Sequence, residues 1–239
     1  MPVQQKQNIK GFSLIELLVI VAIISIIAGI GFPDFMKWQR DRELRAQQEK
    51  IANLFTTATT QVERGAYPYV RIEFVKGTSP AQITVKGINR NTLSKKINSK
   101  NDPTCSITDF TQTATYQVDE ITSHTLNDKT HIPTLAPSPS SGAVSVGSGG
   151  AICFSKGSKY FNQVGAADKQ GNIIFDKSTG APKNYYVTVC HVNDNKCSAV
   201  TGNFSDNYPA YLIRYSRFGL ITKYKWNSKL LPAADWTSQ

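Results

Sequence analysis

An unbroken apolar run near the N-terminus constrains this chain more than any other feature of its sequence. Residues 12–32 read FSLIELLVIVAIISIIAGIGF and contain a single charge, Glu16. A helix of about 20 apolar residues crosses a hydrocarbon layer of about 30 Å. The run therefore predicts a membrane-spanning helix over residues 12–33.

The segment before this run is polar and basic. Residues 1–11 contain Lys6 and Lys10 and no acid. The positive-inside rule therefore places the N-terminus in the cytoplasm and exports the chain beyond the run, although further basic residues after the run weaken the rule. A cleavable secretory signal has a shorter apolar core with a small-residue cleavage site after it. Here a glycine, Gly11, stands before the run instead.

Glu16 is an unusual residue for such a helix. A carboxylate inside a lipid-spanning segment costs a few kcal/mol, so it indicates a function and a partner. The alternative is an interfacial acid that reaches the headgroups from the first helical turn, where it also suits the helix dipole. The residue alone leaves both interpretations open.

The string around Glu16 favours the first interpretation. Residues 11–17, GFSLIEL, resemble the class III signal of type IV prepilins and type II secretion pseudopilins. The resemblance implies that a prepilin peptidase cuts after Gly11 and methylates the new N-terminal Phe12. It also implies that Glu16 sets subunit register by meeting the N-terminal amine of a neighbouring subunit, as an ion pair in a low dielectric. Pro33 is similar to the helix-bending proline of pilins, and it removes a backbone hydrogen bond.

After Pro33 the sequence changes from uniformly apolar to amphipathic. Over residues 34–65 apolar side chains recur at helical spacing among Arg, Gln, Glu and Lys, namely at Leu44, Ile51, Phe55, Ala58 and Val62. This stripe predicts an amphipathic helix that packs against a sheet. Gly65 fits a C-cap and Pro68 prevents continuation, so the helix should end near Arg64.

Beyond Gly65 the apolar period changes to two, which indicates strands. Residues 69–75 alternate, with Val70, Ile72 and Phe74 on one face. Further strands are expected at residues 81–86, 151–154, 172–175, 185–192, 211–215 and 220–226, with a turn at 76–80. Their alternation and short spacing favour antiparallel pairing. The predicted fold is therefore α+β and pilin-like: a long N-terminal helix packed on an antiparallel β-sheet head, residues 66–239.

Two stretches of this head lack a clear pattern. Residues 87–132 are polar and are expected to be an irregular insertion. Residues 133–151, PTLAPSPSSGAVSVGSGGA, are rich in Pro, Ser and Gly, which favours a flexible surface loop, with a partner-binding loop as the alternative. A loop insertion is thus predicted around residues 87–150.

The four cysteines suit an exported head, because disulfides persist outside the cytoplasm. Three pairings are open. Cys190 and Cys197 bracket the turn-prone residues 193–195, so a local bridge is expected there, which leaves Cys105 to pair with Cys153. Reactive or metal-binding thiols are the alternative, but His191 is the one histidine at a suggestive position.

Basic and aromatic residues alternate near the C-terminus. Arg214, Arg217, Lys223 and Lys225 mingle with Tyr215, Phe218, Tyr224 and Trp226, a mixture that binds single-stranded nucleic acid in some proteins. The alternative is a strand with its aromatics toward the core and its lysines toward water. Residues 213–221, IRYSRFGLI, are similar to the hairpin that closes the GspH/FimT-type minor pilin family. Residues 63–65 and 70–72 resemble the same family.

Composition excludes several other classes. The chain has 239 residues, 40% of them hydrophobic and 18% charged, so it is not wholly disordered. Its net charge of +10 permits binding to nucleic acid or anionic lipid without demonstrating either. The absence of CxxC, HExxH, P-loop, GxGxxG and GxSxG strings argues against a zinc site, a nucleotide cofactor and an enzyme.

The sequence thus predicts a FimU-like minor pilin that helps to prime filament assembly at or near the tip of a type IV pilus. The alternatives are a GspH-like type II secretion pseudopilin and a DNA-receptor minor pilin for natural transformation. The resemblance implies other major and minor pilins, the prepilin peptidase and an inner-membrane assembly platform as partners, with membrane lipid before assembly. It implies an inner-membrane protein with a periplasmic head, and then an extracellular pilus subunit.

Overall fold

The computed structural model describes residues 13–75, 81–98, 110, 113, 117–132, 134–136, 144–145, 150–156, 162–164, 185–194, 208–216, 218–227 and 235–239. Two compact units are present, Met1–Gln39 and Arg40–Gln239. The first contains the apolar run, and the second is the head. The later half of the long helix packs into the head, and the predicted boundaries after residues 33 and 65 stay a prediction.

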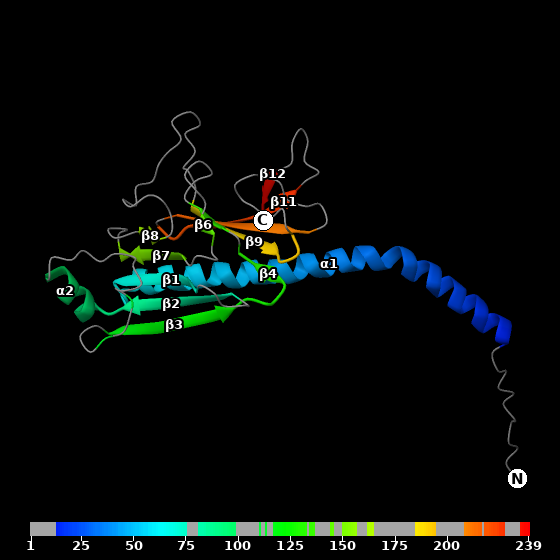
Figure 1. Cartoon of the computed structure of the whole chain (residues 1–239), viewed down its shortest axis with the longest axis horizontal. Coiled ribbons are helices and arrows are strands. Elements are labelled where there is room, and N and C mark those ends of the chain that lie inside the picture. The colour runs from blue at the N-terminus through cyan, green and yellow to red at the C-terminus, as the bar shows by residue number, and fades with distance from the viewer. Residues whose placement is uncertain are drawn as a thin grey trace, which may run out of the picture. The chain divides into compact units, whose positions relative to one another are not determined.

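Helix α1, Leu14–Glu63, is the longest element (Figure 1). Its first part is built from Leu, Ile, Val and Ala, and Pro33 lies inside it. The helix ends as the sequence predicts, one residue before Arg64. The Ala66 N–H donates to the Gln61 carbonyl at 3.1 Å, and the Gly65 N–H donates to the Val62 carbonyl at 3.0 Å. This is a Schellman cap, and Gly65 provides its left-handed residue with a φ of 73°.

The head contains two antiparallel sheets. The first has the order β3-β2-β1-β7-β8. Its strands are β1 Tyr69–Val75, β2 Gln82–Ile88, β3 Val118–Thr125, β7 Gly150–Ser155 and β8 Asn162–Val164. The central strand β1 pairs with β2 on one side and with β7 on the other, where Ile72 lies opposite Val85 and Ile152 respectively.

The second sheet has the order β12-β11-β10-β9-β5-β6, and β4 also pairs with β9. Its strands are β4 Thr130–His131, β5 Thr134–Ala136, β6 Val144–Ser145, β9 Tyr185–His191, β10 Ala210–Tyr215, β11 Ile221–Asn227 and β12 Asp235–Ser238. All of its pairs are antiparallel, with Ile213 of β10 opposite Val187 of β9 and Lys223 of β11.

One hydrophobic core joins the later half of α1 to both sheets. The predicted stripe is confirmed, because Leu44, Ile51, Phe55, Ala58 and Val62 all expose 2% or less of their surface. They share the core with Val70, Ile72 and Phe74 of β1 and with Val187, Tyr211 and Ile213 of the second sheet. The rings of Phe55, Phe154 and Tyr215 form a cluster, with the Phe55 centroid 6.4 Å from that of Phe154 and 4.8 Å from that of Tyr215, and the latter two 6.4 Å apart. The α+β, pilin-like fold predicted from the sequence is thus confirmed.

The predicted irregular insertion over residues 87–132 is wrong for much of its length. It contains the end of β2, helix α2 at Arg90–Asn98, and strands β3 and β4. Asn89 caps α2, since its side-chain Oδ1 accepts the Thr92 N–H at 2.8 Å. Strand β3 is the edge of its sheet and has few buried side chains, so its sequence gives little apolar alternation.

The predicted loop over residues 133–151 is also corrected in part. Strands β5, β6 and the start of β7 lie within it. Residues of β5 and β6 pair with each other, and β5 also pairs with β9. Such short strands depend on backbone pairing to a distant partner, and no local apolar pattern in the sequence predicts them. The expected strand at 172–175 and the turn at 76–80 lie outside the described residues.

Candidate assembly helix and charged contacts of the head

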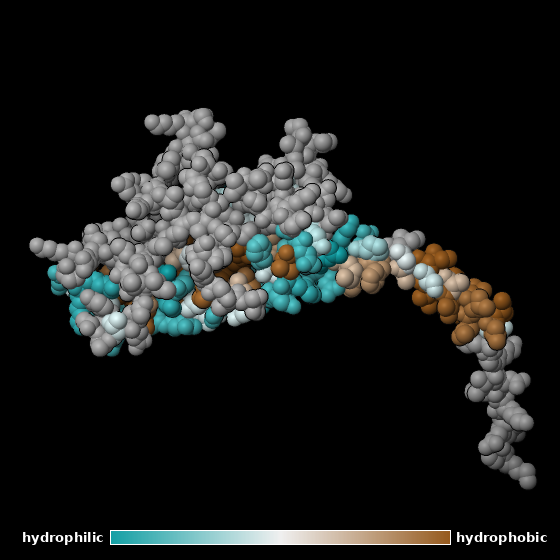
Figure 2. Space-filling view, viewed as in Figure 1, coloured by the Kyte–Doolittle hydropathy of each residue, from teal (hydrophilic) through white to brown (hydrophobic). Residues whose placement is uncertain are grey.

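The first half of α1 presents apolar side chains on all its sides. Twelve large hydrophobic residues between Leu14 and Phe32 expose from 42% to 80% of their surface. They are Leu14, Ile15, Leu17, Leu18, Val19, Ile20, Val21, Ile23, Ile24, Ile26, Ile27 and Phe32. Figure 2 shows this part of α1 as hydrophobic, whereas the later half is mostly hydrophilic on the visible face. A helix that is apolar on every side is stable only when an apolar medium or other helices cover it.

Glu16 lies in the first turn of this helix. The Ser13 carbonyl accepts the N–H groups of Glu16 and Leu17, each at 3.1 Å. The Glu16 side chain is exposed, and within the described ranges no ion pair includes it. Gly11 and Phe12, the predicted cleavage and methylation residues, lie outside the described residues. The structure therefore provides an accessible carboxylate near the start of the apolar helix.

Pro33 stays within α1. Its ring nitrogen has no proton to donate to the Gly29 carbonyl, so one hydrogen bond of the helix is missing at that point. Among the described residues, no unbent helix has the length and apolarity of a membrane span, while Leu14–Gly29 and Phe32–Glu63, bent by 47° at the break between them, meet that test together.

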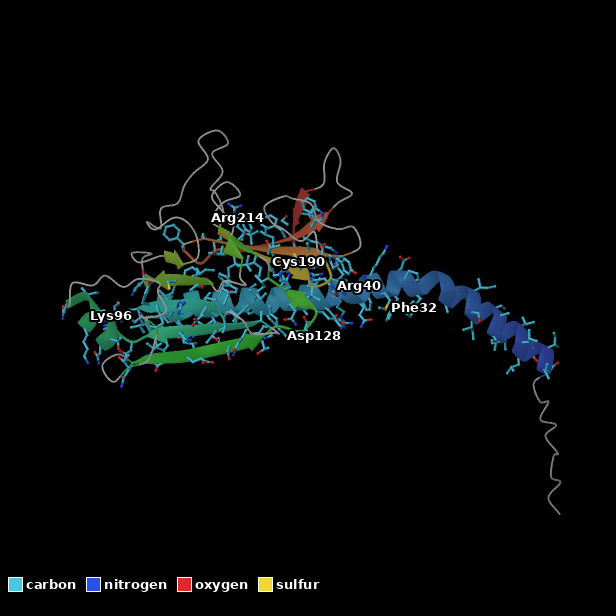
Figure 3. The ribbon with its side chains drawn as sticks, viewed as in Figure 1. Phe32, Arg40, Lys96, Asp128, Cys190 and Arg214 are labelled. Atoms are coloured by element: carbon cyan, nitrogen blue, oxygen red, sulfur yellow. The ribbon has the colours of Figure 1, made fainter. Side chains whose placement is uncertain are left out.

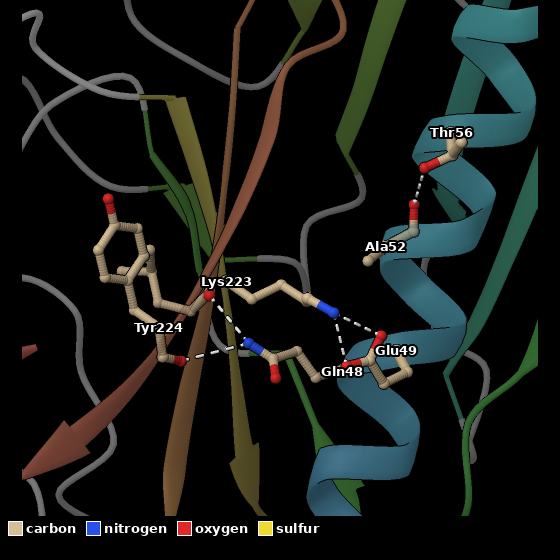
Figure 4. A network of polar contacts seen from close by, with 7 residues as sticks. Gln48, Glu49, Ala52, Thr56, Lys223 and Tyr224 are labelled. Carbon is tan, nitrogen blue, oxygen red and sulfur yellow. Dashed lines mark hydrogen bonds and ion pairs between the residues drawn. The ribbon is translucent and has the colours of Figure 1, made fainter. Parts of the chain in front are cut away.

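The later half of α1 is tied to β10 and β11 by a buried glutamine. Gln48 is fully buried, and its Nε2 donates to the carbonyls of Leu212 at 3.1 Å and Tyr224 at 3.2 Å (Figure 4). Leu212 and Tyr224 lie opposite each other in the sheet. One side-chain amide thus satisfies a carbonyl on each of two neighbouring strands. Gln48 continues the predicted stripe, four residues after Leu44, and this spacing is the signal that sequence reasoning missed.

Two ion pairs reinforce this contact. The Lys223 Nζ lies 2.6 Å from Glu49 Oε1 and 2.7 Å from Oε2. The Lys225 Nζ lies 2.6 Å from Asp41 Oδ1. These pairs connect acids of α1 to alternate residues of β11, so both lysines face the helix.

Tyr211 of β10 joins the same group. The residue is fully buried, and its hydroxyl donates to Asp41 Oδ1 at 2.9 Å. Burial, followed by the hydrogen bond and charge of Asp41, raises the pKa of Tyr211 well above its ordinary value. Asp41 thus accepts from a neutral phenol and a lysine at once. Sequence reasoning gave Tyr211 no role, because its partner lies 170 residues away.

The basic residues predicted to contact DNA therefore differ in their surroundings. Lys223 and Lys225 are ion-paired with Glu49 and Asp41. Arg214 is half-buried on β10 (Figure 3), and Arg217 lies outside the described residues. The paired carboxylates offset the charge that these two lysines would offer to phosphate.

The cysteines are described only in part. Cys153 lies in β7 and Cys190 in β9, both are fully buried, and both are disulfide-bonded. Cys105 and Cys197 lie outside the described residues, so the predicted pairing stays a prediction. Among the described side chains, no three from His, Cys, Asp and Glu come together as metal ligands would.

His191 has a defined environment that its sequence position did not indicate. Its Nδ1 accepts the Asn193 N–H at 3.1 Å, and its ring stacks on Tyr208 at 4.9 Å. The Arg40 guanidinium lies 5.2 Å from the centre of the same tyrosine ring. Burial, together with the charges of Arg40 and Lys129, lowers the pKa of His191, while Glu43 and Asp194 act in the opposite direction.

Comparisons with known proteins agree on the N-terminal segment. Residues 6–32 match the family described as the prokaryotic N-terminal methylation motif. The chain is also 40% identical over 47 residues to the "Type IV major pilin protein PilA" of Myxococcus xanthus (strain DK1622), a stretch that covers 20% of this chain and 21% of that protein. No solved structure matches the chain. The N-terminal segment thus carries a prepilin methylation motif and is similar to that of a type IV pilin, and a helix-plus-sheet head follows it.

Proposed function

We propose that this protein is a minor pilin of a type IV pilus that helps to prime filament assembly at or near the tip. The observation that carries the proposal is the exposed apolar half of α1, which needs a covering partner. Its one acid, Glu16, stands near the predicted new N-terminus. The protein works in this proposal by docking, and not as an enzyme.

The proposed sequence of events follows from the chemistry of the helix. A prepilin peptidase cuts after Gly11 and methylates Phe12. The apolar half of α1 keeps the subunit in the inner membrane, with the head in the periplasm. An assembly platform then transfers the subunit to a filament, where the helices of other pilins replace lipid around the same side chains.

Glu16 has a specific role in that transfer. An unpaired carboxylate in an apolar bundle carries a large desolvation cost, and so does an unpaired amine. When the N-terminal amine of one subunit meets Glu16 of its neighbour, each charge offsets the cost of the other. Because the pair forms only at one axial offset, it selects the register of the two helices.

The minor-pilin assignment rests on the head. Residues 213–221, which begin in β10 and end in β11, are similar to the closing hairpin of the GspH/FimT-type minor pilins. A GspH-like pseudopilin of type II secretion would use the same helix and hairpin. Detection of the protein in sheared extracellular filaments supports a pilus subunit, and its confinement to the cell envelope supports a pseudopilus subunit.

A DNA-receptor role has less support. It needs accessible cations on the C-terminal strands, and Lys223 and Lys225 are held by Glu49 and Asp41. Retention of DNA by the purified protein, lost at high salt, would favour this role over a scaffold.

Replacement of Glu16 tests the proposal. We expect Glu16→Ala to leave the amount of membrane-bound protein unchanged or higher, because removal of an acid makes insertion easier. We expect its amount in sheared filaments to fall strongly, because breaking one side of a buried ion pair costs about 3–5 kcal/mol. Glu63→Ala, at the exposed far end of α1, is the matched control and should assemble like wild type. Equal incorporation of both variants would contradict the role of Glu16.

A further inference from the structure

Two aromatic side chains follow the apolar run on α1. Phe35 and Trp38 expose 55% and 54% of their surface. Their ring centroids lie 5.8 Å apart, with the rings inclined at 37°. Residues three apart on a helix share one side of it, so the two rings form a single exposed aromatic patch.

The charged residues begin at the same point. Between Leu14 and Pro33 the helix contains one charge, Glu16, whereas Asp34 and Lys37 both fall within the next four residues. Lys37 is exposed and directly precedes Trp38. The aromatic patch therefore lies where α1 changes from an apolar to a charged surface, with a cation beside it.

The position along the helix matches the structure of a bilayer. Residues 14–32 of α1 span about 28 Å at 1.5 Å per residue, close to the roughly 30 Å of a hydrocarbon core. Phe35 and Trp38 lie about 4.5 and 9 Å further along the helix axis. Each headgroup layer is about 5–8 Å thick. When the apolar run fills the hydrocarbon core, Phe35 therefore lies in the headgroup layer that follows the run, and Trp38 lies at the outer edge of that layer.

We infer that Phe35, Lys37 and Trp38 form a lipid-binding patch that holds the stored subunit in the headgroup layer of an anionic membrane. The inference rests on the proposed function, because it requires that the apolar run is stored in a bilayer. Trp suits this layer, since its ring is apolar and its indole N–H is a donor. Lys37 supplies the positive charge that attracts anionic headgroups. The patch directly follows the exposed apolar run, which the proposed function stores in lipid, and this continuity favours lipid over a protein partner.

Single-tryptophan variants of the full chain test this inference in vesicles of phosphatidylcholine and phosphatidylglycerol. Trp226→Phe/Trp236→Phe leaves Trp38 as the reporter of the patch. Trp38→Phe/Trp236→Phe leaves Trp226 as a control in the head. A third variant adds Ile24→Trp to the three Trp→Phe changes and reports on the middle of the run. Circular dichroism checks that each variant folds, and lipids brominated near the headgroup or near the chain end quench nearby tryptophans.

We expect Trp38 to lose more than half of its emission with bromine near the headgroup and less with bromine near the chain end. The Ile24→Trp reporter should show the reverse order, and Trp226 should keep its emission with both lipids. Lys37→Glu should lower the quenching of Trp38 in vesicles with phosphatidylglycerol, whereas Lys50→Glu, on the α1 segment of the head, should not.

The failure of the inference differs from the failure of the proposed function. If the Ile24→Trp reporter is quenched by lipid and Trp38 is quenched only by acrylamide in water, the patch does not bind lipid, although the helix is stored in the membrane. If Trp38 resists both lipid and acrylamide, a protein surface covers it, and the inference is again wrong. If the Ile24→Trp reporter also escapes lipid, membrane storage itself is contradicted.

Discussion

At the scale of single residues, Gly219 fixes the hairpin between β10 and β11. Its φ is 82°, and a Cβ at this position would lie 2.6 Å from the Thr59 Cγ2 on α1. The Ser216 hydroxyl accepts the N–H groups of Phe218 at 3.2 Å and Leu220 at 3.1 Å. The turn is thus held by its own hydrogen bonds and lies close to α1. Only glycine fits at position 219 without a shift of its neighbours.

Gly219→Ala should therefore destabilise the head by more than the backbone conformation alone explains. A left-handed conformation costs a residue with a Cβ about 1–2 kcal/mol, and the contact with Thr59 adds to that. Gly65→Ala is a matched control, since Gly65 has a φ of 73° but nothing within 4 Å of its Cβ position. Urea unfolding of both variants measures the difference. Equal losses would show that the hairpin moves away from Thr59 without cost.

At the scale of elements, the contact between α1 and the β10–β11 pair is polar at its centre. Gln48 donates to two strand carbonyls, and Glu49 pairs with Lys223 beside it. Gln48 is fully buried, while the side chains of Lys223 and Glu49 are 31% and 39% exposed. Neighbouring residues of one helix therefore make a buried and a solvent-exposed contact to the same strand.

Gln48→Leu should lower the free energy of unfolding by about 1–3 kcal/mol, because the carbonyls of Leu212 and Tyr224 lose a buried donor. The same substitution removes the buried Gln48 Oε1, which has no hydrogen-bond partner in the described part of the chain. Removal of this atom reduces the loss of stability. Urea unfolding at low and high salt should give the same loss, since the contact involves no charge.

Glu49→Gln should behave differently. An exposed ion pair contributes roughly 0–1 kcal/mol and is screened by salt. We therefore expect a small loss at low salt that disappears at high salt. A loss larger than that of Gln48→Leu would mean that the ion pair, and not the buried amide, holds the helix against β11.

At the scale of the whole molecule, its histidines should make the protein less stable in mild acid. Burial lowers the pKa of His191, and also of His124 and His131. Below the ordinary histidine pKa of about 6.5, the unfolded chain takes up protons that the folded chain does not. The free energy of unfolding then falls as the pH falls through this window, until the folded-state pKa is passed.

His191→Asn tests this dependence. Asparagine keeps an acceptor near the Nδ1 that receives the Asn193 N–H, but it does not titrate. Between pH values of about 6.5 and 5, the variant should lose less stability than wild type, by at most about 1.4 kcal/mol per pH unit. Urea unfolding across this range provides the measurement, and unchanged slopes would show that His191 is protonated alike in both states.

The disulfides are the other property of the whole head. Cys190–Cys197 and Cys105–Cys153 remain the predicted pairs, and the short loop closed by the first should add about 2–3 kcal/mol in the chain-entropy model. Peptide mapping under non-reducing conditions identifies the pairs. A peptide that joins Cys105 to Cys190 would contradict this pairing but not the export of the head.

The sequence by itself determined the elements whose signal is local. The apolar run, the stripe from Leu44 to Val62 and the cap at Gly65 depend on neighbours within a few turns, so their spacing was sufficient to predict them. The same holds for β1, whose alternation places Val70, Ile72 and Phe74 in the core. The GFSLIEL string likewise indicated a prepilin segment, because its signal lies in a few consecutive residues.

Only the tertiary structure decided which distant groups meet. Residues 87–132 contain α2, β3 and β4, and the edge strand β3 is held by backbone bonds to β2 that any side chains permit. The sequence does not show that Lys223 and Lys225 have partners. In the folded chain they form ion pairs with Glu49 and Asp41 of α1. From the sequence, Gln48 is expected to face solvent. In the folded chain its amide donates to two strand carbonyls. Long-range pairing satisfies backbone and charge without a periodic pattern, and that is why the sequence alone left these contacts undetermined.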